Sequence, residues 1–259
     1  DLHSFPTRRS SDLEDTLTIP AADTELNDDG TMTYIYSAAI TGLTPGGSYE
    51  YRVGYTDRRS EWFPLKTAAG STFKALIFPD SQSADYGVWK NTAMPAWERN
   101  KDAQFFINIG DLVDNGQSGY QWNAWFEGCE DMIRQIPLVP LDGNHEMYDL
   151  NWQMHLPVSY TTLFDLPKNG LPEYPDQFYS FDYGDIHFTV LDTQFTELKD
   201  FEPDLLKDEV AWVKKDLEKT EKKWKIVLMH KDVLQYGFNP ETRPETREEG
   251  FSEDRKSVV

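Results

Sequence analysis

The chain has 259 residues, of which 45 are acidic and 25 are basic, so its formal net charge is −20 at pH 7. Such an acidic surface argues against nucleic acid or an anionic membrane as a partner. Hydrophobic residues make up 39% of the chain and aromatic residues 14%, which indicates a packed globule rather than a disordered chain. No apolar run approaches the length of a membrane span. The single cysteine, Cys129, excludes a disulfide framework and a cysteine-based zinc site.

The two ends of the chain resemble translated sequencing adapter. Residues 1–13 read as one strand of a common short-read adapter, and residues 254–259 read as the opposite strand. Two adapter matches in opposite orientation favour sequencing scars over a basic disordered tail. Such residues carry no information about the natural fold. We therefore expect residues 14–253 to be an internal fragment of a longer gene.

Residues 14–69 are typical of β-structure. Three segments rich in β-branched and aromatic residues predict strands, and a Gly-Pro cluster at 42–47 predicts a turn between two of them: the strands are expected within 31–40, 49–55 and 62–67. The string T-G-L-T-P-G-G-S-Y-E-Y-R-V-G at 41–54 resembles the later strands of a fibronectin type III-like sandwich. Residues 14–69 are therefore expected to form part of such a domain, with exposed strand edges.

From residue 70 onward, strands alternate with helical stretches. Apolar runs predict strands at 73–78, 105–109 and 136–141. Residues 83–101 predict a helix interrupted at Pro95, and residues 120–134 predict an amphipathic helix. This alternation indicates a layered α/β domain.

The second half of that domain begins with a long connection. Residues 150–176 contain four prolines, and a loop of this length is often functional. A hairpin is expected around the turn at 184–185, followed by a helix and a strand at 224–229 that ends in His230. The apolar face of that helix is predicted to carry Leu206, Val210, Val213 and Leu217.

Polar side chains follow four of the predicted strands. Asp80, Asp111, Asn144 and His230 supply the oxygen and nitrogen ligands that suit divalent and trivalent metal ions. Two cations about 3.5–4 Å apart can hold both the attacking and the leaving oxygen of a phosphoryl group. His145 could then donate a proton to the leaving oxygen.

These residues carry a resemblance to a known family. The blocks resemble, in order, those of the calcineurin-like metallophosphoesterase superfamily: Asp80-x-Gln82, Gly110-Asp111-x-x-Asp114, Gly143-Asn144-His145-Glu146 and the strand-end His230. The preceding β-segment makes the chain most similar to the purple acid phosphatase-like branch. The resemblance implies an α/β/β/α sandwich over residues 70–253, truncated at its C-terminal end.

The resemblance also implies a role for each residue at the strand ends. Asp80 would bind the first metal, with Gln82 either as a further ligand or as a hydrogen-bond partner of the ligands. Asp111 would bridge the two metals, and Asn144 and His230 would bind the second. His145 would be the catalytic residue, Glu146 would orient it, and Asp114 would support the site. The cofactors implied are two divalent or trivalent ions (Fe, Mn or Zn), and the implied reaction is hydrolysis of small phosphomonoesters or phosphodiesters by a metal-bound hydroxide.

Three departures from the family pattern leave alternatives open. Gln82 stands where many members have a histidine, Asp114 stands where the coloured enzymes have a tyrosine, and a G-H-x-H block is missing. This chain is therefore predicted to be inactive by itself and not purple. One alternative is a non-catalytic metal- or ligand-binding module of a larger extracellular protein, and another is an enzyme with one tight and one weak metal.

Two further histidines are not expected to bind a metal ion. His187 is expected to be a packed core residue, and His155 is expected to lie on the surface of the long loop. The composition and the resemblance favour a secreted or cell-surface protein, and the oligomeric state is not predicted.

Overall fold

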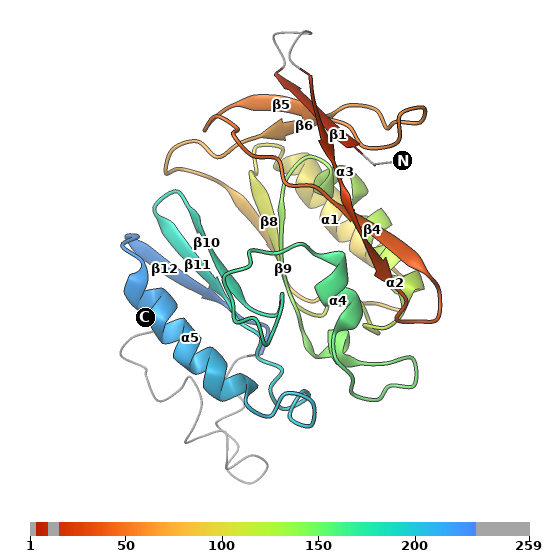
Figure 1. Cartoon of the computed structure of the whole chain (residues 1–259), viewed down its shortest axis with the longest axis vertical. Helices are drawn as coiled ribbons and strands as arrows, with labels where there is room; N and C mark the ends of the chain where they lie inside the picture. The colour runs from red at the N-terminus through yellow and green to blue at the C-terminus, as the bar shows by residue number, and fades with distance from the viewer. Residues whose placement is uncertain (1–3, 10–15, 232–259) are drawn as a thin grey trace.

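The computed structural model describes the backbone of residues 4–9 and all of residues 16–231 (Figure 1). The adapter-like segment 254–259 and the polar stretch after His230 lie outside the described residues. The strands of the first part are β1 Ser4–Arg9, β2 Leu17–Pro20, β3 Ala22–Leu26, β4 Thr33–Ser37, β5 Ser48–Tyr51 and β6 Phe63–Lys66. The elements that follow are β7 Ala75–Phe78, α1 Gly87–Arg99, β8 Phe105–Ile109, α2 Gly119–Gly128, α3 Glu130–Ile133, β9 Leu138–Leu141, the 3₁₀ turn η1 Asn144–Met147, α4 Val158–Leu163, β10 Tyr179–Tyr183, β11 Ile186–Val190, α5 Leu205–Lys219 and β12 Trp224–Leu228.

The first part of the chain is all β, as the sequence predicts. One antiparallel sheet has the order β2-β1-β5-β6, and β3 pairs with β4 in a separate two-stranded ribbon. The sequence does not predict β1, because this strand lies within the adapter-like segment. Its backbone pairs with β2 on one side and with β5 on the other. The fibronectin type III-like assignment of residues 14–69 stays a prediction.

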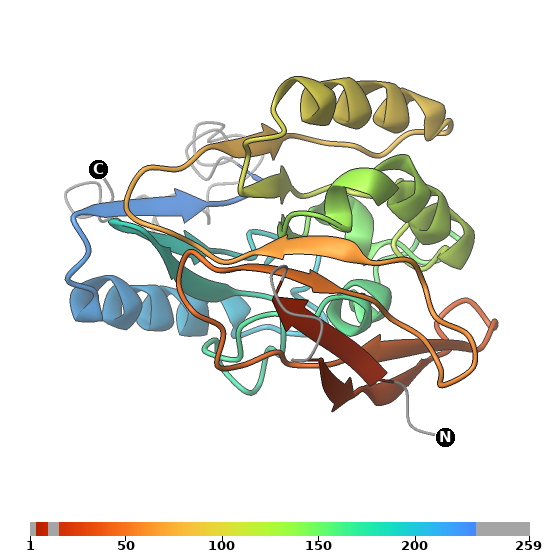
Figure 2. The ribbon, with the colours of Figure 1, turned by 90° about the horizontal axis from the view of Figure 1, so that it is seen from above.

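The second part contains two three-stranded sheets that face each other. Strands β7, β8 and β9 are parallel, whereas β10 and β11 form the predicted antiparallel hairpin and β12 pairs parallel to β11. Helices α1, α2 and α3 lie outside the first sheet and α5 lies outside the second (Figures 1 and 2). The arrangement is a mixed α/β fold with helices on the outer faces of the two sheets.

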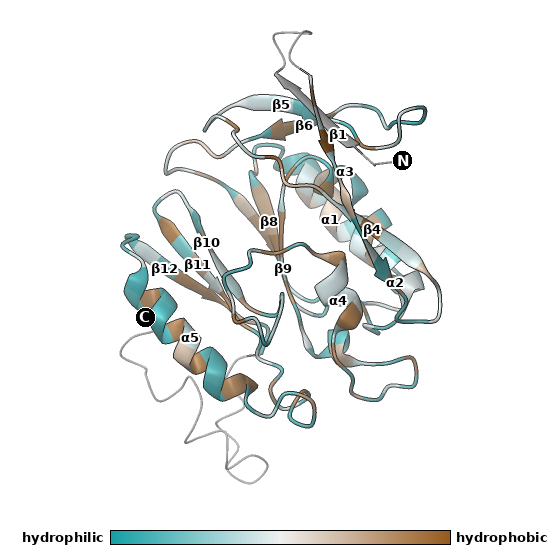
Figure 3. Ribbon diagram, in the orientation of Figure 1, coloured by the Kyte–Doolittle hydropathy of each residue, from teal (hydrophilic) through white to brown (hydrophobic). Residues whose placement is uncertain are grey.

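Aromatic side chains fill the space between the two sheets. Phe105 of β8 lies 6.0 Å from Phe188 of β11, measured between ring centroids, and Phe188 stacks on Phe181 of β10 at 4.8 Å. These residues belong to one buried hydrophobic cluster that also includes residues of α1 and α2. Apolar colour is concentrated on the strands of both sheets (Figure 3). Burial of these large rings fixes how the sheets face each other.

Several element predictions are corrected by the structure. Helix α1 runs through Pro95 without interruption, because the buried face formed by Trp89, Ala93 and Trp97 outweighs the loss of one backbone hydrogen bond. The helix predicted at 120–134 is divided at Cys129, which ends α2 and precedes α3. Residues 150–176 contain the short helix α4.

The buried face of α5 differs from the predicted face in part. Its buried side chains are Leu205, Glu209, Trp212 and Val213. Of the four predicted positions, only Val213 is fully buried, while the others are partly covered. The apolar periodicity located the helix correctly, but it could not reveal that an acidic residue, Glu209, points into the interior.

The β-rich part packs against the α/β part through Asp28. Its carboxylate accepts a hydrogen bond from Ser159 Oγ at 2.7 Å and lies 3.2 Å from His155 Nε2. The prediction that His155 lies on the loop surface is therefore wrong, because the Asp28 carboxylate holds the imidazole at this contact. His187 is buried, as predicted, between the carboxylates of Asp182 and Asp216. No helix among residues 16–231 is long and apolar enough to cross a membrane.

Replacement of Trp125 by alanine should destabilise the fold strongly. Trp125 is fully buried, stacks on Trp89 at 5.7 Å and donates a hydrogen bond to Ser81 Oγ. Loss of a large core side chain costs about 3–5 kcal/mol in the free energy of unfolding, measurable by urea titration. The control, Tyr120→Ala, changes an exposed residue of the same helix and should cost less than about 0.5 kcal/mol. Equal effects of the two changes would contradict this packing.

Candidate metal centre

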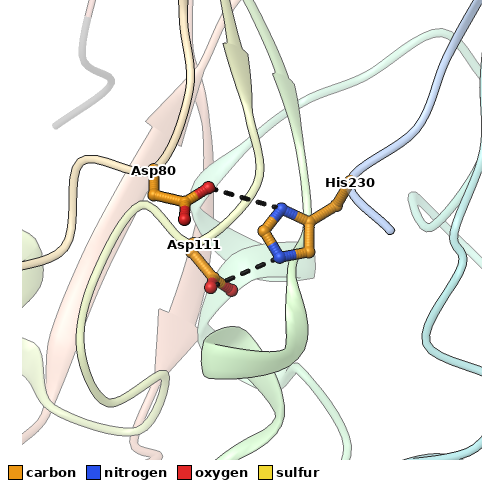
Figure 4. A group of neighbouring side chains, drawn as sticks. All are labelled: Asp80, Asp111 and His230. Atoms are coloured by element: carbon orange, nitrogen blue, oxygen red, sulfur yellow. Dashed lines mark ion pairs between the residues drawn. The ribbon is translucent and has the colours of Figure 1, made fainter. Parts of the chain in front are cut away.

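Three of the predicted ligands meet at the carboxyl ends of the strands. Asp80 follows β7, Asp111 follows β8 and His230 follows β12. Their ligand atoms all lie within 4.8 Å of one another. His230 Nδ1 is 3.8 Å from Asp80 Oδ1 and His230 Nε2 is 3.3 Å from Asp111 Oδ2, so the imidazole stands between two carboxylates (Figure 4). Two carboxylates and an imidazole at this spacing can share a divalent or trivalent ion.

The backbone at the end of β8 is shaped for close approach. Gly110 has a φ of 75°, and a Cβ atom at this position would come within 2.6 Å of His230 Nδ1 and 2.8 Å of the Asp142 carbonyl oxygen. Asp111 itself has a φ of 48°, a conformation that side-chain-bearing residues adopt rarely and often at functional sites. A Cβ on Gly143 would overlap the Asp111 carboxyl group. Glycines at 110 and 143 therefore allow Asp111 and His230 to meet.

Glu146 binds the backbone of two loops at the centre. Its fully buried carboxylate accepts hydrogen bonds from four backbone N–H groups: the donors are Asp111 (3.0 Å), Leu112 (2.8 Å), Val113 (3.2 Å) and Gly143 (2.7 Å). These backbone amides take up both of its oxygens, and the role of Glu146 in orienting His145 stays a prediction. Burial and the charge of Asp111 raise the pKa of Glu146 to about 8, against the lowering effect of its hydrogen bonds.

The His145 ring is held by Asp114. Its Nδ1 lies 2.7 Å from the Asp114 carbonyl oxygen and 3.5 Å from the Asp114 carboxylate. A carbonyl oxygen only accepts hydrogen bonds, so Nδ1 carries the hydrogen and Nε2 is left to face the site. That Nε2 is 4.0 Å from Asp111 Oδ2. The backbone N–H of His145 also donates to Asp111 Oδ1 at 2.9 Å, which ties the imidazole to the ligand group.

The other two predicted ligands lie beside this group. Gln82 Nε2 donates to Asp111 Oδ2 at 3.2 Å, while Gln82 Oε1 is buried without a hydrogen-bond partner. Asn144 begins η1, next to His145, and its side chain has no hydrogen-bond partner among the residues the structure describes. An orphaned amide oxygen beside buried carboxylates fits a metal ion, because a cation would satisfy it.

The electrostatics of the centre reflect the proximity of these groups. Burial opposes the charge of Asp111, but its hydrogen bond to His230 and the nearby positive charges lower its pKa. Burial likewise disfavours the imidazolium of His230, but Asp111 overcomes this effect and raises the pKa of His230 to about 9. In the metal-free chain a proton on His230 therefore balances the Asp111 charge, and a cation bound here would replace that proton.

Sequence reasoning missed three buried acidic residues behind the centre. Asp142, Asp192 and Glu209 are fully buried, and each has at least one carboxylate oxygen without a partner. Burial, followed by the charges of Asp192 and Glu146, raises the pKa of Asp142 well above its ordinary value. Asp192 lies two residues after the end of β11, so the strand-end criterion that located the candidate ligands would have found it.

The removal of Glu146 should destabilise the fold. Glu146→Ala leaves four backbone N–H groups without an acceptor, and we expect the free energy of unfolding to fall by at least about 3 kcal/mol. Glu146→Gln keeps one acceptor oxygen and should cost less. Urea titration measures both values, with the exposed Glu127→Ala as the control. A small loss in the alanine variant, close to that of the control, would show that these hydrogen bonds do not support the loops.

Comparisons of the chain with known proteins agree on one family. The calcineurin-like phosphoesterase family matches residues 81–255. Purple acid phosphatase 15 of Arabidopsis thaliana is 26% identical over 238 residues, a match that covers 78% of this chain and 43% of that protein. Acid phosphatase type 7 of Mus musculus is 24% identical over 219 residues, covering 77% of this chain and 45% of that protein. The chain thus spans less than half the length of these relatives.

Solved structures share the fold. The purple acid phosphatase PPD1 from seeds of yellow lupin (Lupinus luteus) superposes with a TM-score of 0.73 at 18% identity, over 90% of this chain and 46% of that one. PhoD superposes with a TM-score of 0.56 at 16% identity, over 87% of this chain and 54% of that one. The family match covers more than half of the residues, so the chain belongs to the calcineurin-like phosphoesterase family.

Proposed function

We propose that this chain carries the metal centre of a phosphoesterase that hydrolyses phosphomonoesters or phosphodiesters with the aid of two metal ions (Fe, Mn or Zn). The single observation that carries the proposal is the meeting of Asp80, Asp111 and His230 at the strand ends, with ligand atoms within 4.8 Å of one another. A site for general metal storage would not need the neighbouring His145, whose Nε2 faces Asp111 from 4.0 Å.

The ligand assignment is the one that the family resemblance implies. Asp80 and the orphaned Oε1 of Gln82 would hold the first ion, and His230 and Asn144 would hold the second. Asp111 lies between both pairs, since its Oδ2 faces both Gln82 and His230, and it would bridge the ions. Metal ions held there would supply Lewis-acid polarisation of the phosphoryl oxygens and of water.

His145 would supply the proton for the leaving oxygen. The Asp114 carbonyl fixes the hydrogen on Nδ1, so a protonated ring donates from Nε2, on the side of the metal ligands. The Asp114 carboxylate lies 3.5 Å from the same Nδ1 atom. Asp114 is therefore a positioning residue in this proposal.

Two substitutions separate metal binding from proton donation. In the full-length protein, Asp111→Asn should weaken Mn²⁺ binding, measured by titration calorimetry, by at least tenfold and should abolish hydrolysis of 4-nitrophenyl phosphate and its diester. His145→Ala should keep metal binding within about threefold but lower hydrolysis by about 10²-fold, because only the proton donor is lost. Asp57→Asn, at an exposed position in the β-rich part, is the control.

The outcomes distinguish the proposal from its alternative. Unchanged hydrolysis in both variants would refute the assignment of these residues. Metal binding without hydrolysis of any ester would favour a non-catalytic binding module, the reading that Gln82 in place of a histidine motivates.

Metal affinity should increase with pH. The pKa of His230 is raised to about 9, so the imidazole is protonated at neutral pH and must lose its proton before it binds a metal ion. We expect the affinity for Mn²⁺ to rise by up to about tenfold per pH unit between pH 6 and 8, with about one proton released. Calorimetry in buffers of different ionisation enthalpy measures that proton. The same slope in His230→Gln would show that another group controls the pH dependence.

A further inference from the structure

Two aromatic side chains stand beside His145 on the loop that follows η1. The Tyr148 ring lies 5.4 Å from the His145 ring, and the Trp152 ring lies 6.3 Å from it, measured between ring centroids. Both rings meet the imidazole edge to face, with interplanar angles of 84° and 89°. Tyr148 and Trp152 also contact each other at 5.5 Å. The three rings form one aromatic cluster at the rim of the metal centre.

Trp152 is not placed there to fill the core. Its side chain is 52% exposed, and its φ of 60° is a backbone conformation that bulky residues rarely adopt. Exposure of a large ring and an unfavourable backbone conformation both oppose stability, and such features cluster at ligand sites. The position therefore reflects a use for the exposed ring.

The loop that presents Trp152 is held rigidly. The Asp149 carboxylate accepts hydrogen bonds from the backbone N–H groups of Asn151 at 2.7 Å and Gln153 at 2.8 Å. Trp152 N–H donates to the Asp149 carbonyl oxygen at 2.9 Å, and Leu150 N–H donates to Gln117 Oε1 at 2.8 Å. The ring is thus set in position before any ligand arrives, which lowers the entropic cost of binding.

The location of the cluster indicates which part of a substrate it would meet. If His145 donates to the leaving oxygen, the group attached to that oxygen must lie beside the imidazole. Tyr148 and Trp152 occupy the flank of that imidazole, and the exposed Leu150, Met154 and Leu156 extend the apolar surface along the same loop. A small polyol such as glycerol has little apolar surface to place against these side chains, whereas an aromatic ring would gain contact.

We propose that Tyr148 and Trp152 form a leaving-group subsite that selects phosphate esters of aromatic alcohols. This inference rests on the function proposed above. In the reaction the bond between phosphorus and the aryl oxygen breaks, and a bond between phosphorus and a water oxygen forms. The electron pair leaves with the aryl oxygen, which takes its proton from His145, and the water gives up one proton. The products are the phenol and phosphate.

The test compares two esters in the Mn²⁺-loaded full-length protein, because this chain is predicted to be inactive by itself. Trp152→Ala should lower kcat/KM for phenyl phosphate about tenfold and change kcat/KM for glycerol 3-phosphate less than about twofold, because an aromatic pair is lost for the first ester alone. Trp152→Phe keeps a ring and should restore most of the preference. Trp224→Ala, which removes an exposed tryptophan at the far end of β12, is the control and should alter neither ester.

A binding measurement gives a second readout that does not need turnover. Phenylphosphonate should bind to the Mn²⁺-loaded full-length protein more tightly than methylphosphonate. In titration calorimetry, Trp152→Ala should lower the ratio of the two affinities about tenfold. Selective loss in both experiments supports the subsite.

Two different results would overturn the inference in distinguishable ways. Hydrolysis of both esters with an unchanged ratio in Trp152→Ala, or an equal loss for both, would exclude the subsite and leave the proposed function intact. Absence of hydrolysis and of phosphonate binding in the unsubstituted full-length protein would overturn the proposed function and the subsite together.

Discussion

The metal centre depends on one buried carboxylate that never needs to touch a metal. Glu146 accepts four backbone N–H groups, three from the loop after β8 and one from Gly143 after β9. Those loops carry Asp111 and His145, so the carboxylate sets the separation of these two side chains. Each buried amide left unpaired would cost about 1–3 kcal/mol, which makes this geometry much more stable than any in which the loops separate.

A second constraint is the concentration of acidic side chains around the strand ends. Asp80, Asp111 and Glu146 lie at the centre, and Asp142 and Asp192 are buried near it. Burial raises the pKa of Glu146 and of Asp142, while the neighbouring Asp111 raises the pKa of His230 and favours its protonated ring. Burial of so many carboxylates near one point is costly unless cations compensate. Bound metal ions would therefore stabilise this arrangement.

The sequence predicted the ligand group because strand ends are readable from apolar runs. Parallel strands bring their carboxyl ends to one edge of a sheet, so the residues after β7 and β8 had to lie together. His230 comes from the other sheet, and the same pattern, a polar residue after an apolar run, joined it to the group. The hairpin β10–β11 was predicted for a similar local reason, namely its turn residues.

Contacts between distant segments were not readable in the same way. Nothing local indicates that Glu146 binds the backbone of residues 111–113, that Glu209 points inward from α5, or that Asp28 meets His155. Each of these depends on tertiary packing. The continuity of α1 through Pro95 shows the same rule, since buried tryptophans outweighed a strong local signal.

The contact at Asp28 also links the β-rich part of the chain to the rim of the centre. Asp28 accepts hydrogen bonds from Ser159 Oγ and, through its carbonyl oxygen, from Gln117 Nε2, while Gln117 also binds the loop of Trp152 through Leu150 N–H. The aromatic rim is therefore supported from two sides, by the strand-end loops beneath it and by the turn between β3 and β4 beside it. In this arrangement the β-rich part contributes to the position of the rings that would face a substrate, although none of its own residues lies among the metal ligands.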